Sequence, residues 1–142
     1  CSSDLHVSNK SITSSIKKFC NNQHRYDLED LSSQVGLYYL LGILNSKIAG
    51  ILLADQRGGD YHIYPEHIRN IPIPIASDEL QEKIGNYTKQ ILDAKAKSLS
   101  VDTSVLESEI DRLVYHLYNL TYDEVLIVDP KTQITREEYE NY

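Results

Sequence analysis

The residues of this chain best suited to chemistry are cationic and amide side chains, and most of them lie in its first half. Lys and Arg can bind phosphates or guanine edges, whereas Asn and Gln can form paired hydrogen bonds with adenine. These types predict contact with nucleic acid. The candidate residues are Lys17, Lys18, Asn22, Gln23, Arg25, Arg57, Gly58, Gly59, Tyr61, His62 and Arg69.

Two parts of this set have ordinary alternatives. The stretch 17–25 has the composition of a polar surface loop, and Arg57 with its two glycines also fits a simple turn. The glycines nevertheless allow positive φ and close approach of the backbone to a ligand. His62 and His67 lack a third or fourth ligand at a metal-binding spacing, so we expect them to donate hydrogen bonds.

Catalytic motifs are absent from the sequence. It contains no glycine-rich cofactor loop, and Asn70-Ile71-Pro72-Ile73 only superficially imitates the Asn-Pro-Pro-aromatic motif of adenine methyltransferases. Asp93-Ala94-Lys95 has the acid-x-Lys form of a restriction nuclease but falls within a predicted helix, where residues two apart point in different directions. We therefore expect no catalytic residue, metal site or cofactor within the chain itself.

The charge is divided unevenly along the 142 residues. Residues 1–76 carry seven Lys/Arg and seven Asp/Glu, whereas residues 77–142 carry seven against fourteen, which accounts for the net charge of −7. A phosphate-binding surface needs local positive charge. We therefore expect any DNA-binding surface in the first half, with the acidic second half facing away from DNA.

Composition predicts the protein's setting. The chain has no methionine, so we expect it to be a piece of a longer protein. Its two cysteines form neither a disulfide framework nor a zinc spacing, which is typical of reduced thiols and a cytoplasmic location.

The second half predicts helices. Ile71–Ile75 cannot be helical because its two prolines fix the backbone, so it forms an edge strand or an extended connector. Ser77 is placed to cap a helix over 78–99, and Ser104 with Glu107 to cap a second over 104–119. Their short connection favours an antiparallel hairpin. Thr121 with Glu124 then begins a short helix that Asp129-Pro130 ends, and a frayed polar tail follows.

The first half predicts a mixed lobe. Residues 1–27 read as one or two short strands, and residues 61–64 as another. A helix over 34–54 carries a broad apolar face. That helix has the length of a membrane span, but Lys47 near its centre would be costly in lipid, so a core helix is expected and no membrane partner. The predicted fold class is α+β, a small mixed lobe packed on a central helix and followed by the helical hairpin.

The order of these features resembles a known family. An apolar helix, a glycine loop, the sequence IRNIPIPI, a Gln at the start of a long helix, and LVYHLYNL at the end of the next helix follow one another over 37–129. This order resembles the C-terminal specificity domain, or target recognition domain, of TaqI-like Type IIG restriction–modification enzymes. It is also similar to the half-domains of Type I specificity subunits.

The resemblance implies a division of the chain and a function. Residues 1–76 would be part of a target-recognition lobe, 77–129 a helical hairpin plus a short helix, and 130–142 a polar tail. The implied function is recognition of double-stranded DNA for a protein that methylates adenine and cleaves nearby. S-adenosylmethionine and magnesium would serve upstream methyltransferase and nuclease domains of that protein.

Two other functions remain open from the sequence. The helices predicted at 78–99 and 104–119 could dock the methyltransferase domain or a second copy of the chain, which would make this a protein–protein module and a homodimer. Alternatively, the chain could be half of a Type I specificity subunit, which would need two such halves.

Overall fold

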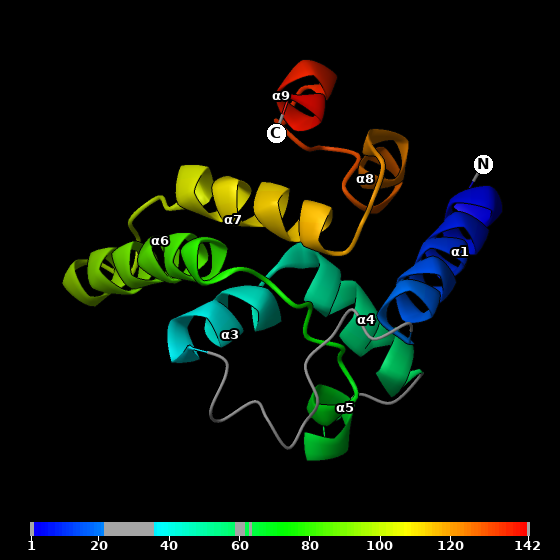
Figure 1. The fold of residues 1–142 in the computed structure, drawn as a ribbon, viewed down its shortest axis with the longest axis horizontal. Helices are drawn as coiled ribbons and strands as arrows, with labels where there is room; N and C mark the ends of the chain where they lie inside the picture. Colours follow the sequence, from blue (N-terminus) through cyan, green and yellow to red (C-terminus); the bar gives the residue numbers. More distant parts are fainter. Residues whose placement is uncertain (1, 22–35, 59–61, 63, 142) are drawn as a thin grey trace.

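A computed structural model describes residues 2–21, 36–58, 62 and 64–141, and this part of the chain is mostly helical (Figure 1). Apart from a single bridge residue at Pro74, no β structure occurs in these ranges, so the α+β prediction is wrong. The helices are α1 (Ser2–Asn21), α3 (Leu37–Leu44), α4 (Lys47–Arg57), α5 (Pro65–Arg69), α6 (Asp78–Lys97), α7 (Ser104–Leu117), α8 (Tyr122–Val128) and α9 (Arg136–Glu140).

The strands predicted for the first lobe are replaced by helices. Residues 2–21 form α1, because Ile12, Ile16 and Cys20 recur every fourth residue and bury one helical face against the core. Tyr64 lies just before α5 and is not part of a strand. Of the other residues of the strand predicted at 61–64, residues 61 and 63 lie outside the described ranges. The mixed lobe is therefore a helical lobe wherever it is described.

The single helix predicted over 34–54 is two helices that meet at Asn45 and Ser46. The Ser46 hydroxyl donates to the Ile43 carbonyl at 2.7 Å and accepts the Ala49 N–H at 3.3 Å, which ends α3 and caps α4. Together α3 and α4 have the hydropathy of a membrane span but are bent by 66°, and none of the helices described here qualifies alone.

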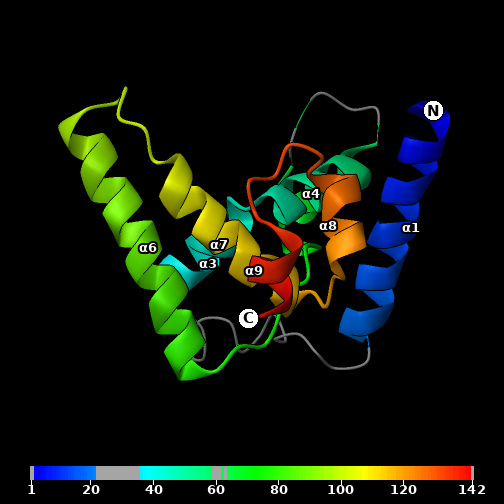
Figure 2. The ribbon, with the colours of Figure 1, turned by 90° about the horizontal axis from the view of Figure 1, so that it is seen from above.

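The core depends on a close approach between α3 and α6. Gly42 of α3 faces Ile84 and Thr88 of α6, and a Cβ at this glycine would lie only 2.7 Å from Ile84 Cγ2. Helix α6 also contacts α7, and the two run in opposite directions (Figure 2), so the hairpin expected from the short connection at 98–103 is present.

The isoleucine–proline segment is extended, as predicted, and it is buried. Ile71, Pro72, Ile73 and Pro74 are all inaccessible to solvent, and only Ile75 is half exposed. Two tyrosines hold its carbonyl oxygens. Tyr39 of α3 donates to Pro74 at 2.7 Å, and Tyr118, just after α7, donates to Pro72 at 2.5 Å.

Two of the three helix caps that the sequence predicts are present in the structure. Ser77 caps α6 by accepting the Leu80 N–H at 3.1 Å, and Thr121 and Glu124 form the capping box of α8. Ser104, by contrast, is the first residue of α7 and does not cap it. Thr103 precedes it and donates to the Glu107 carboxylate at 3.0 Å.

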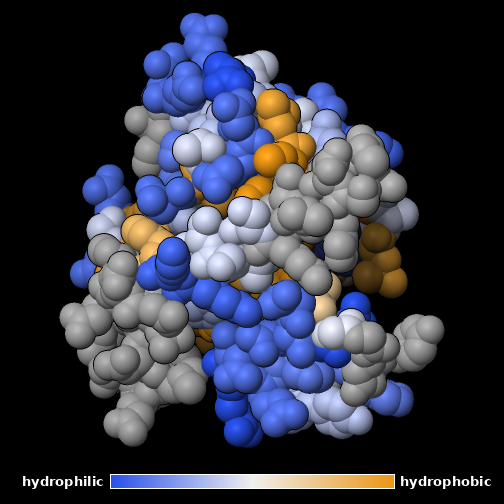
Figure 3. All heavy atoms as spheres, turned by 90° about the vertical axis from the view of Figure 1, so that its right-hand side faces the viewer, coloured by the Kyte–Doolittle hydropathy of each residue, from blue (hydrophilic) through white to orange (hydrophobic). Residues whose placement is uncertain are grey.

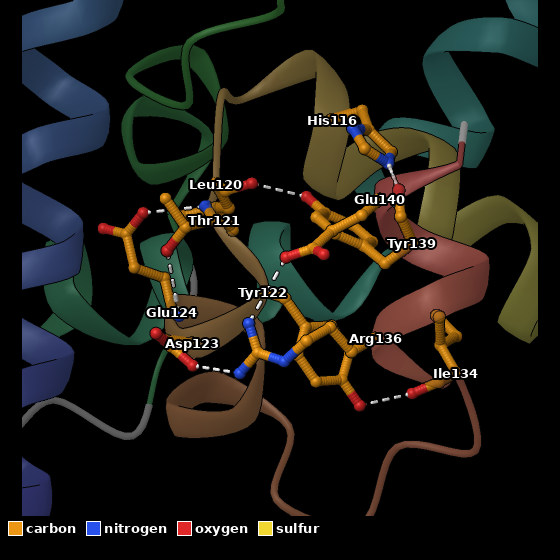
Figure 4. Close-up of polar contacts among 10 residues, drawn as sticks. All are labelled: His116, Leu120, Thr121, Tyr122, Asp123, Glu124, Ile134, Arg136, Tyr139 and Glu140. Carbon is orange, nitrogen blue, oxygen red and sulfur yellow. Dashed lines mark hydrogen bonds and ion pairs between the residues drawn. The ribbon is translucent and has the colours of Figure 1, made fainter.

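The C-terminal tail is ordered against the body rather than frayed (Figure 4). Thr135 and Glu138 form a capping box that begins α9. Tyr139 is buried and donates to the Leu120 carbonyl at 2.6 Å, while its ring stacks on His116 with centroids 3.9 Å apart. Tyr122 donates to the carbonyl of Ile134 at 2.7 Å. These side-chain contacts hold the tail against the body, although its polar composition predicted fraying.

Candidate nucleic-acid interface and a polar cleft

The predicted basic residues of α1 lie beside the end of α4. Lys17 and Lys18 are both exposed near the C-terminus of α1, and Lys17 Nζ pairs with Asp55 of α4 at 2.8 Å. Helix α4 contacts both α1 and α5, the helices that carry the other predicted basic residues. Lys17 is already neutralised by Asp55, whereas Lys18 is an exposed cation.

Arg57 has an unusual environment at the end of α4. Its side chain is half buried, and its Nε is enclosed with no hydrogen-bond partner among the residues that the structure describes. Gly58 follows with φ of +61°, a conformation that side chains rarely adopt, and its N–H closes the helix on Ala54. The positive φ that the sequence suggested for the glycine loop is therefore present at Gly58.

Helix α5 adds an arginine and aromatic rings. Arg69 is exposed in the last turn of this short helix. His67 accepts the Tyr64 N–H through Nδ1 at 3.0 Å, which fixes the start of the helix. The Tyr64 ring lies 5.5 Å from that of His67 and 6.2 Å from that of His62, so the three rings form one cluster.

The rest of the predicted set cannot be placed. Asn22, Gln23, Arg25, Gly59 and Tyr61 lie outside the described residues. On the α1 side of the molecule, the described surface is mostly hydrophilic (Figure 3). The basic candidates Lys17, Lys18, Arg57 and Arg69 thus lie on helices joined by contacts of α4, and their role in DNA binding stays a prediction, as does that of the amide side chains.

A second feature is a cleft that the sequence did not predict. It encloses about 560 Å³ between the α3–α4 junction, the second half of α6, the first half of α7 and residues 129–134. Because its lining comes from four separated segments, no local spacing reveals it. Its polar lining includes Lys47, Lys95, Glu107, Asp111, Asp129 and Lys131.

A polar network lies at one side of this cleft. Asp111 of α7 accepts the backbone N–H of Lys47, the first residue of α4, at 3.0 Å. The Lys47 ammonium pairs with Asp129 at 2.8 Å, and Tyr115 donates to the other oxygen of Asp129 at 3.2 Å. Burial raises the pKa of Asp111 to about 6, although the hydrogen bond and charge of Lys47 oppose this.

Comparison with known proteins adds one match. Part of the chain is similar to a DNA-modification enzyme. Over 86 residues, 58% of the chain, it is 34% identical to the Type II methyltransferase M.MjaIV of Methanocaldococcus jannaschii, and the match covers 28% of that protein. No protein-family model matches the chain, and no solved structure matches it. The similarity relates the chain to restriction–modification proteins.

Proposed function

We propose that this chain is the DNA sequence-recognition part of a restriction–modification protein that methylates adenine and cleaves DNA. The observation that carries the proposal is the partial similarity to a Type II methyltransferase. The chain corresponds to little more than a quarter of that relative and lacks the motifs of methyl transfer, so a role other than catalysis fits it best. The rest of such a protein would bind S-adenosylmethionine and magnesium.

The arrangement of α1, α4 and α5 supports this proposal. Lys18, Arg57 and Arg69 lie on three helices joined by contacts of α4, and His62 and Tyr64 add aromatic rings just before α5. Cations of this kind bind phosphates, and neighbouring polar groups then contact bases. The acidic residues of the second half are concentrated on α6–α9, away from these positions in the chain.

The test is binding of a labelled DNA duplex by the protein that carries this chain, with Arg57 and Arg69 each changed to Ala. Each substitution should weaken binding and lower the slope of log affinity against log salt by about one. Lys97→Ala is the matched control, because Lys97 is an exposed cation at the distant end of α6. If both arginine variants bind as wild type does with an unchanged salt slope, these two residues do not contact DNA.

One observation favours a second function, docking of another protein. Apolar side chains are exposed where α6 and α7 meet, and Leu99 and Val105 retain 89% and 76% of their accessible surface. Leu92 and Val101 are exposed beside them. Such a group suits contact with a methyltransferase domain, with a second copy of the chain, or with the other half of a Type I specificity subunit.

Light-scattering mass measurement over a dilution series separates these possibilities. A dimer that persists on dilution and is lost in Leu99→Lys with Val105→Glu would favour pairing of two copies. A monomer at all concentrations would argue against pairing of two copies and leave docking to the methyltransferase domain. DNA binding by the arginine variants tests the recognition proposal separately.

A further inference from the structure

The cleft has the dimensions and walls of a small-molecule site. Its apolar surface comes from Leu41 of α3, Ile91 of α6, Ile110 of α7 and Ile134, which are residues distant in the sequence. Ligand sites of proteins are commonly apolar clefts of a few hundred cubic ångströms with a small number of directed polar groups. A volume of about 560 Å³ falls within that range.

Asp111 is one of the polar groups that line this cleft. One of its oxygens accepts the Lys47 N–H, and the other makes no hydrogen bond within the described part of the chain. Asp111 is partly buried, and a carboxylate with one oxygen that has no protein donor gains from a new donor.

The charged groups around Asp111 bear on whether a ligand at this carboxylate should be a cation or an anion. Those that act on it are the Lys47 ammonium and the carboxylates of Asp129 and Glu107. The Lys47 ammonium is itself paired with Asp129 at 2.8 Å. Lys95 and Lys131 also line the cleft. Because the Lys47 ammonium is paired with Asp129, Asp111 has no ion-pair partner of its own among the described residues, and its carboxylate favours a cationic group.

We propose that the cleft binds a small organic cation, an amidinium or ammonium group on a flat apolar body. The cationic group donates to the open oxygen of Asp111, and the body packs between Ile91, Ile110 and Ile134. This site is independent of the DNA-recognition proposal, because it lies between α4, α6 and α7 and uses none of the candidate DNA-binding residues.

The test uses benzamidine as the probe, with neutral benzamide and anionic benzoate as matched ligands of the same shape. Titration of the isotope-labelled chain, followed by NMR, should give saturable shifts for benzamidine at the methyl groups of Ile91, Ile110 and Ile134. Benzamide and benzoate should bind at least about tenfold more weakly. Equal binding of the three ligands, or shifts that do not saturate, would overturn the proposal.

Variants locate the interaction. Asp111→Asn should weaken benzamidine binding at least about tenfold, whereas Glu109→Gln should not, since Glu109 is on the same helix but does not line this cleft. Retained affinity in Asp111→Asn would refute the role of the carboxylate. If Asp111→Asn does not fold, the pH dependence of benzamidine binding to the wild-type protein tests the role of the carboxylate instead.

The pH series follows from the surroundings of Asp111. The groups that face it are Lys47 from α4, Glu107 and Tyr115 from α7, and Asp129 after α8. Benzamidine remains a cation from pH 5 to 8, so only the protein changes charge. Because burial raises the pKa of Asp111 to about 6, affinity should fall about threefold or more between pH 7.5 and 5.5. A flat profile would contradict the proposal.

Discussion

The hydroxyl of Tyr39 lies 2.7 Å from the carbonyl oxygen of Pro74 and donates a hydrogen bond to it inside the core. Tyr118 does the same for Pro72, two residues earlier, at 2.5 Å. Both tyrosines are essentially inaccessible to solvent, with 1% exposure each. Two helices that are distant in the sequence thus hold the segment that joins α5 to α6.

Removing either hydroxyl should destabilise the fold. Tyr39→Phe and Tyr118→Phe each leave a buried carbonyl oxygen without its donor, which costs about 1–3 kcal/mol of unfolding free energy. Urea denaturation monitored by circular dichroism measures the change. Tyr87→Phe is the control, because the half-buried Tyr87 hydroxyl makes no hydrogen bond among the described residues, and it should stay within about 0.5 kcal/mol of wild type.

Two glycine substitutions should act in opposite directions. In Gly42→Ala the new Cβ would meet Ile84 Cγ2 at 2.7 Å and Thr88 Oγ1 at 2.8 Å, so the gain in helix propensity is outweighed by a packing cost of about 1–3 kcal/mol. In Gly50→Ala the Cβ meets nothing within 4 Å, and the variant should be up to about 1 kcal/mol more stable. Thermal unfolding of both variants checks the prediction, and a shift of the same sign in both would refute it.

Asp111 should make stability depend on pH. Its pKa rises from an ordinary 3.8 to about 6 in the folded protein, so between these values the folded state binds more protons than the unfolded state. Its contribution to the unfolding free energy therefore falls by roughly 1–2 kcal/mol as pH rises from 4 to 6. The difference between wild type and Asp111→Asn should show this slope, since Asn still accepts the Lys47 N–H. Asp93→Asn, an exposed control on α6, should show none.

Thr135→Ala should loosen α9 alone. Loss of the capping oxygen costs about 1 kcal/mol, and α9 is a short terminal element. Hydrogen exchange of the Tyr139 amide, which donates to the Thr135 carbonyl at 3.0 Å, should accelerate about fivefold. Amides of α6 should exchange at wild-type rates, and an equal acceleration there would mean that α9 unfolds only with the whole protein.

Local signals in the sequence were sufficient to predict α6, α7 and α8. The stripe Leu80, Ile84, Tyr87 and Ile91 with the Ser77 cap specifies α6, and Thr121 with Glu124 specifies α8. The sequence also carries the Thr135-x-x-Glu138 pattern of a capping box, but the polar tail around it favoured the wrong interpretation.

The predictions are wrong where two hydrophobic patterns overlap in the sequence, and incomplete where a feature depends on residues that are far apart in the sequence. Leu5 and Val7 alternate as in a strand, whereas Ile12, Ile16 and Cys20 repeat as in a helix, and the helical repeat prevails because it faces the core. Within the apolar stretch 34–54, Ser46 resembles an ordinary polar residue of a single helix, but its hydroxyl lies at the boundary between α3 and α4 and caps α4. The cleft combines four segments and has no signature in any of them.

The buried connector has a mechanical consequence. Pro72 and Pro74 are both held by tyrosines and have fixed φ angles, so the buried part of the connector between α5 and α6 has little conformational freedom. A displacement of α5 should therefore be transmitted through this connector to α6 and to α7, which packs on α6.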